Sequence, residues 1–265
     1  MKAGILGLAI FFAVTACTQD KNAVPTGTLT LHFQYQVNGS PAVFNSMQYT
    51  NAAGNRYEIT NVQWFISDMA LINKDGKTID LSPENPIHYI DSDMPQTGIL
   101  ELNGIPPGEY RSIMFVFGIR GEKNIPDMYT DPPESNMMWP YAMGGDFGGY
   151  HYMKFNGFWE NPSGQRTPFN CHLGVGQIYD QDGNITGYVQ NWFEVFLPRS
   201  SFIMSSGSLK EAYVNMNLES WFETPHIFDW NFFGGAIMNN QEAMGMIRDN
   251  GSDVFSIDFV SGETN

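Results

Sequence analysis

The clearest pattern in the chain is an alternation of apolar and polar residues that begins at Thr28. Every second residue from Leu29 to Val37 is apolar, which is the period of a strand with one buried face. Leu31 and Phe33 therefore point toward a core, and His32 points away from it. Asn38-Gly39 follows at once and predicts a tight turn into a second strand.

Apolar runs of strand length recur along the chain, with turn signals such as Asp75-Gly76 between them. Only residues 235–247 carry apolar side chains at the spacing of a helix face. Short strands separated by turns predict an all-β fold, a single β-sandwich (immunoglobulin-like or related) with long loops and a short C-terminal helix. The expected strands include 29–37, 57–72, 87–90, 100–102, 110–119, 189–196 and 212–218, and a further one carries the Tyr150-His151-Tyr152 sequence.

The N-terminus has the three parts of a secretory signal. Lys2 supplies positive charge, residues 4–14 form an apolar stretch, and Val14-Thr15-Ala16-Cys17 ends it. The apolar stretch is shorter than the ~20 residues that span a bilayer as a helix. We expect a lipoprotein signal peptide over residues 1–16, a lipidated tether over 17–27 and one domain over 28–265.

The ending before Cys17 resembles the bacterial lipobox, whose cysteine carries lipid. The alternative is a plain secretory signal in which the cysteine is incidental. The residue after Cys17 is Thr18, whereas an aspartate at this position would argue against sorting to the outer membrane. We therefore expect an outer membrane lipoprotein of the cell envelope. The membrane is then a partner through lipid on Cys17.

Composition narrows the choice of partners. The formal net charge is −15, so nucleic acid is not an expected partner, because phosphate binding needs an excess of Lys and Arg. Aromatic residues make up 14% of the chain, which favours a packed domain over a disordered one. With Cys17 lipidated, Cys171 has no disulfide partner, and burial is the favoured explanation for it.

Candidate chemistry is concentrated in residues 131–176, a Gly-rich stretch with histidines, a cysteine, methionines and aromatics. Imidazole is a ligand for copper, and a thioether or thiolate nearby favours the reduced ion. His151 lies between two tyrosines on an expected strand, and His172 lies beside a Leu-Gly turn. Each of the two could instead be structural, through hydrogen bonds or by capping the backbone.

Two further histidines, His32 and His88, lie on expected strands and are additional ligand candidates, with Asp91 able to orient an imidazole. The chain has no HExxH or CxxC motif, which leaves a zinc protease or a structural zinc site without support. It also has no Gly-x-Ser-x-Gly elbow and no phosphate loop. We therefore do not expect an enzyme.

Several segments, in this order, resemble the MbnP-like family, in its Bacteroidetes-type branch. The resemblance runs from about Thr28 to Phe255 and rests on the order of the motifs rather than on any one of them. The matching segments are 57–71, Asp75-Gly76, 105–110, 115–119, Asn136-Met137-Met138-Trp139, Gly149-Tyr150-His151-Tyr152-Met153-Lys154, His172-Leu173-Gly174 and 237–250.

The resemblance implies a periplasmic or surface copper-binding protein on a β-sandwich. In relatives, histidines bind copper together with a tryptophan that a partner di-haem enzyme oxidises to kynurenine. Trp139 and His172 occupy matching positions here, and His151 lies in a motif where relatives vary. Some relatives carry an Asn-His pair within residues 121–127, whereas here Asn124 is followed by isoleucine.

The resulting hypothesis is a membrane-anchored copper-binding lipoprotein for copper acquisition or handling. His151 and His172 are the expected metal ligands, with His88 and His32 as further candidates, and Trp139 is the candidate for oxidation. One alternative is a metal-free surface module that binds a glycan or a protein partner. Another is a subunit of a surface complex in which residues 131–176 form the docking loop.

Overall fold

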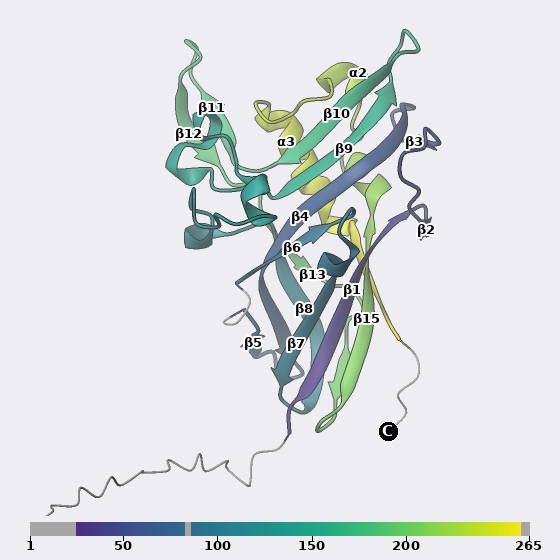
Figure 1. Ribbon diagram of the computed structural model, residues 1–265, viewed down its shortest axis with the longest axis vertical. Helices are drawn as coiled ribbons and strands as arrows, with labels where there is room; N and C mark the ends of the chain where they lie inside the picture. The colour runs from purple at the N-terminus through teal and green to yellow at the C-terminus, as the bar shows by residue number, and fades with distance from the viewer. Residues whose placement is uncertain (1–24, 83–85, 261–265) are drawn as a thin grey trace, which may run out of the picture.

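Two β-sheets pack against each other around an aromatic core in the computed structural model, which describes residues 25–82 and 86–260 (Figure 1). The expected signal peptide and Cys17 lie outside the described residues. The first sheet has the order β16 (Phe255–Phe259), β15 (Leu209–Asn217), β1 (Gly27–Val37) and β2 (Ser40–Pro41), with β7 (Ile99–Ile105) also on β1. β1 and β15 are parallel. The all-β, sandwich-like fold expected from the sequence is confirmed.

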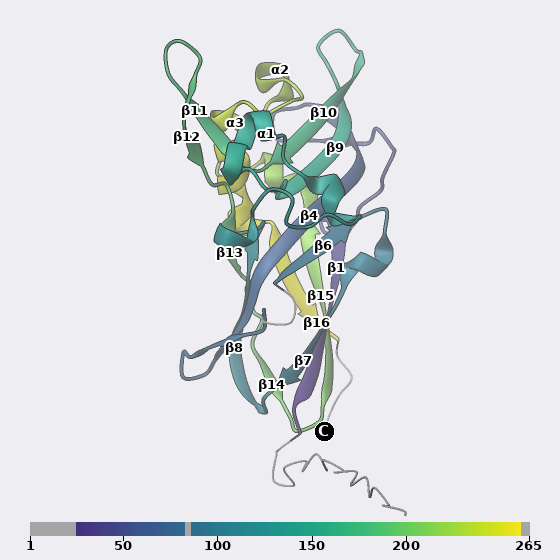
Figure 2. The ribbon, with the colours of Figure 1, turned by 60° about the vertical axis from the view of Figure 1, so that its left-hand side comes forward.

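The second sheet is built on one long strand. Its order is β10 (Arg166–Leu173), β9 (Met153–Glu160), β4 (Arg56–Asn73), β8 (Gly108–Phe117) and β13 (Phe193–Phe196). β14 (Phe202–Met204) pairs with β8, and β3 (Tyr49–Thr50), β5 (Thr78–Asp80) and β6 (Ile87–Asp91) pair with β4. A separate hairpin of β11 (Gly176–Tyr179) and β12 (Ile185–Val189) projects at the same end of the molecule as the turn between β9 and β10 (Figure 2).

Aromatic side chains from both sheets fill the interface between them. Phe33 of β1 packs edge-on against Trp64 of β4, and Trp64 also contacts Phe117 and Phe255. The side chains of Leu31 and Phe33 are buried and His32 lies on the other face, as the alternation predicted. Burial of aromatic surface on this scale is the main stabilising contribution to such a sandwich.

Two sequence expectations about element boundaries were wrong. The expected strand 189–196 is divided, because β12 ends at Val189 and β13 begins only at Phe193. The helix α3 spans Gln241–Asn250 rather than 235–247. It begins there because the Asn240 side chain accepts a hydrogen bond from the backbone N–H of Ala243 and caps the first turn. Shorter helices are α1 (Tyr141–Gly144) and α2 (Trp230–Phe233).

β4 determines where the long 119–151 segment leaves and returns to the sheet. β9 and β8 pair with successive stretches of β4, and Phe65 lies between these stretches. The N–H of Gly118 donates to the Phe65 carbonyl over 2.8 Å, and the N–H of Phe65 donates to the Tyr152 carbonyl over 3.0 Å. The two ends of the 119–151 segment are therefore held beside the same residue of β4.

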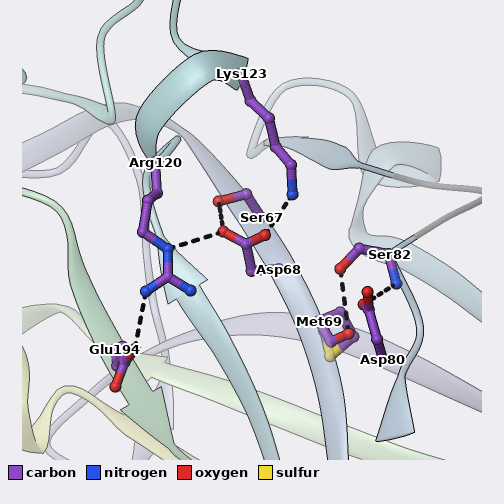
Figure 3. Close-up of polar contacts among 8 residues, drawn as sticks. All are labelled: Ser67, Asp68, Met69, Asp80, Ser82, Arg120, Lys123 and Glu194. Atoms are coloured by element: carbon purple, nitrogen blue, oxygen red, sulfur yellow. Dashed lines mark hydrogen bonds and ion pairs between the residues drawn. The ribbon is translucent and has the colours of Figure 1, made fainter.

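An ion-pair cluster fixes the first part of this segment to β4 (Figure 3). Asp68 has a left-handed backbone, with φ of 51°, at a bulge in β4. Its carboxylate accepts hydrogen bonds from Arg120, over 3.2 Å, and from Lys123. Arg120 also donates to Glu194 of β13 over 2.9 Å. No helix in the described part of the chain is long and apolar enough to span a bilayer.

Candidate metal centre

The fold brings His151 and His172 together although they lie far apart in the sequence. His151 ends the 119–151 segment, two residues before β9 begins, so its expected place on a strand was wrong. His172 is the second-last residue of β10. The ring centroids are 5.0 Å apart and the rings are nearly perpendicular, at 88°. Because metal–imidazole bonds are about 2 Å long, this spacing suits two imidazoles on one ion.

Hydrogen bonds define the tautomer of each ring. His151 donates from Nδ1 to the Met137 carbonyl over 2.9 Å, and His172 donates from Nε2 to the Asn156 side-chain oxygen over 2.9 Å. The remaining nitrogens, His151 Nε2 and His172 Nδ1, are buried and have no hydrogen-bond partner among the described residues. Each therefore presents an unused lone pair, and its other nitrogen is oriented as in metal-bound histidines.

Both imidazoles are held in the neutral form that a metal requires. Burial, repulsion from His172 when that ring is protonated, and the positive charge of Lys154 lower the pKa of His151 to about 3. Burial and the charge of Lys154 lower the pKa of His172 to about 4. At neutral pH no proton competes with a metal ion for the two free lone pairs.

Trp139 completes the buried cluster. Its ring centroid lies 4.7 Å from that of His151, and its Nε1 is buried without a hydrogen-bond partner among the described residues. Three glycines, Gly144, Gly148 and Gly174, lie so close to the indole that a Cβ on any of them would meet it at 3.1 Å or less. The local sequence thus leaves room for the indole beside the histidine pair.

The glycine closest to the indole gives a direct test of this packing. A Cβ on Gly174 would lie 2.4 Å from two carbons of the Trp139 ring. Gly174→Ala is therefore expected to displace the ring from His151 and to lower the free energy of unfolding by about 1–3 kcal/mol. Denaturant unfolding and tryptophan fluorescence measure the two effects.

Gly108→Ala is the matched control for Gly174→Ala, because Gly108 is the first residue of β8, as Gly174 directly follows the last residue of β10, and a Cβ added to Gly108 would have no atom within 4 Å. It should leave the fluorescence unchanged. Equal effects of the two substitutions would show that Gly174 does not position Trp139.

The other sequence candidates lie elsewhere. His32 is on β1, with Nε2 3.6 Å from the carboxylate of Glu211. His88 is on β6, with Nε2 2.8 Å from the Thr97 carbonyl. The Asp91 carboxylate accepts hydrogen bonds from Asn61, Gln63 and Tyr89 rather than from a histidine.

Cys171 directly precedes His172 in the sequence, so its side chain lies on the opposite face of β10. It is buried there. Burial raises the pKa of its thiol well above the usual range, so it is protonated and is a poor metal ligand. Within residues 25–82 and 86–260, no group of three or more His, Cys, Asp and Glu side chains is placed to hold a metal. The candidate centre is therefore a two-histidine site with a tryptophan beside it.

Sequence reasoning missed the residues that orient the ligands. Asn156 lies on the same face of β9 as Lys154, and β9 pairs with β10. The Asn156 side-chain oxygen accepts the hydrogen bond from His172. The Met137 carbonyl accepts both from the His151 ring and from its backbone N–H. The β9–β10 register would have revealed Asn156, whereas a backbone carbonyl leaves no signal in sequence.

The residues present fit a copper ion. Two neutral imidazoles with unused, buried lone pairs are suitable ligands for copper, and the set contains no carboxylate that would favour Mg²⁺ or Ca²⁺. A structural zinc site would need four ligands. The donor set is therefore closer to that of a low-coordinate copper centre.

Comparisons with known proteins give a consistent result. The sequence model of the MbnP family matches residues 26–239. The solved structure of MbnP from Methylosinus trichosporium matches with a TM-score of 0.53, covering 90% of this chain and 100% of that one, at 13% identity. Likeness at this identity shows a shared fold. A search of curated proteins found no match.

Proposed function

This chain belongs to the MbnP family, and on that premise we propose that it is a copper-binding protein of the cell envelope that serves copper acquisition or handling. The observation that carries the proposal is the pair of histidines, His151 buried and His172 half-buried, each with one ring nitrogen held by a hydrogen bond and the other buried without a partner among the described residues. The proposal includes a membrane anchor through lipid on Cys17 and an outer membrane location, which rest on the N-terminal sequence.

His151 and His172 would hold the ion. Copper bound there supplies a soft cation that can exist in two oxidation states. The protein's part is to keep both imidazoles neutral, to fix their tautomers through Met137 and Asn156, and to bury the two ring nitrogens that remain free. Binding, rather than catalysis, is the proposed role, because imidazoles with pKa values of about 3 and about 4 are weak general bases at neutral pH, and the N–H group of each ring is already hydrogen-bonded.

Trp139 is the proposed site of oxidation to kynurenine by a di-haem partner enzyme. Two observations support this proposal: Trp139 contacts His151, and its indole nitrogen has no hydrogen-bond partner among the described residues, so a modified ring would lie next to the proposed metal ligands. The di-haem partner would use dioxygen or a peroxide to cleave the indole Cγ–Cδ1 bond with addition of two oxygen atoms, which gives N-formylkynurenine. Hydrolysis would then release the Cδ1 carbon as formate and leave kynurenine. The new carbonyl and aryl amine would lie beside the histidine pair.

Native mass spectrometry of the protein isolated from its own membranes tests these proposals together. We expect one tightly held copper per chain, a lipid mass on Cys17, and a Trp139 peptide in which one carbon is replaced by one oxygen. The metal-free protein should take up one copper on titration with Cu(I) or Cu(II). A chain that retains no copper and takes up none would favour the metal-free glycan- or protein-binding module.

A further inference from the structure

Lys154 places a positive charge next to the two candidate ligands. It lies directly opposite His172 in the β9–β10 register, and side chains at opposite positions of an antiparallel pair share one face of the sheet. Its charge contributes to the lowered pKa of both His151 and His172. A cation in this position repels any positively charged ion that binds between the two imidazoles.

A hydrogen bond holds the Lys154 ammonium in place. Its Nζ donates to the Asn136 carbonyl over 2.6 Å, one residue before the Met137 carbonyl that orients His151. Half-burial lowers the pKa of Lys154, while the carbonyl acceptor favours the protonated amine. Lys154 therefore connects β9 to the turn that positions His151 and Trp139.

No negative charge at the site offsets this lysine. None of the ion pairs between described residues includes Lys154. The two histidines are neutral ligands, and no group of three acidic, cysteine or histidine side chains forms there in the described part of the chain. An ion at the centre thus keeps its full charge next to a fixed ammonium group.

We propose that Lys154 makes this centre selective for Cu(I) over Cu(II). Its repulsion of a bound ion scales with the charge of that ion, so it disfavours Cu(II) about twice as strongly as Cu(I). Burial reduces screening by salt and preserves the difference. The inference deepens the proposed function and rests on it, since it assigns the choice of oxidation state to a residue that is not itself a ligand.

Three substitutions separate charge from hydrogen bonding. Lys154→Arg keeps both the charge and a donor, Lys154→Gln keeps a donor without the charge, and Lys154→Met keeps neither. Competition with Cu(I) and Cu(II) chelators gives both affinities for each variant, and voltammetry gives the reduction potential. The full mature chain is used throughout, and circular dichroism checks that each variant is folded.

If Lys154 acts by charge, the ratio of Cu(I) to Cu(II) affinity falls by about tenfold in both Gln and Met variants and is retained in the Arg variant. A tenfold change corresponds to a potential about 59 mV lower. An unchanged ratio in the Gln variant, in a parent protein that binds copper, overturns this inference alone. If only the Met variant changes, and loses both affinities equally, Lys154 is merely a structural contact and the inference also fails. A parent that binds no copper overturns the proposed function as well.

Discussion

Replacing His172 with Ala is expected to lower the affinity for copper by at least about a hundredfold and to leave the domain folded. Changing a residue that only orients a metal ligand typically costs tenfold to a hundredfold, so loss of the ligand itself should cost at least the upper value. The fold should persist because His172 lies on the half-buried outer face of β10, away from the aromatic core. Chelator competition measures the affinity, and circular dichroism measures the fold.

His88→Ala is the matched control for His172→Ala. His88 is also a half-buried strand histidine, and its ring contacts the Thr97 carbonyl rather than another histidine. Its loss should leave copper stoichiometry and affinity unchanged. A large loss of copper in the His88 variant, with binding retained in the His172 variant, would refute the assignment of the centre to His151 and His172.

The sequence predicted the parts of the fold whose pattern is local. β1 alternates regularly, and β4 is a long apolar run ended by a turn at Gly76, which has φ of 84°. The order of motifs also predicted the family correctly.

β9 and β10 were missed because Gly157 and Pro168 interrupt their patterns. Gly157 is needed because a Cβ there would lie 2.1 Å from the Glu58 carbonyl, and Pro168 is tolerated because β10 is the last strand of its sheet path.

The candidate site could be predicted only as a set of residue types. His151 and His172 were named from chemistry and from motif position, but 21 positions separate them and no short spacing joins them. Their meeting depends on the return of the 119–151 segment to Phe65 and on the N–H of Tyr152 donating to the Leu173 carbonyl over 2.7 Å. These are long-range contacts, and the sequence does not display them. The free lone pairs on His151 Nε2 and His172 Nδ1 could be identified only from the hydrogen bonds that the other ring nitrogens make to Met137 and Asn156.

The metal-free protein is expected to lose stability as the pH falls below about 6.5, and His151 should account for roughly 2 kcal/mol of this loss at about pH 5. The pKa of His151 is about 3 in the folded protein, because burial, repulsion from His172 when that ring is protonated, and the positive charge of Lys154 oppose protonation. The unfolded chain therefore binds a proton that the folded protein does not. The contribution of His151 is fully present above about pH 6.5 and is lost as the pH falls toward 3. His172, with a pKa of about 4, acts in the same direction.

Denaturant unfolding of the parent and of His151→Asn, at about pH 7.5 and about pH 5 with chelator present, tests this expectation. Asn can donate to the Met137 carbonyl from nearly the position of Nδ1 but does not titrate. Any loss of packing in the variant appears at both pH values, so the difference between the two pH values isolates protonation. That difference should be smaller in the variant by roughly 2 kcal/mol. The same difference in both proteins would mean that His151 is protonated as readily in the folded state as in the unfolded state, and that the pair is not kept neutral for a metal.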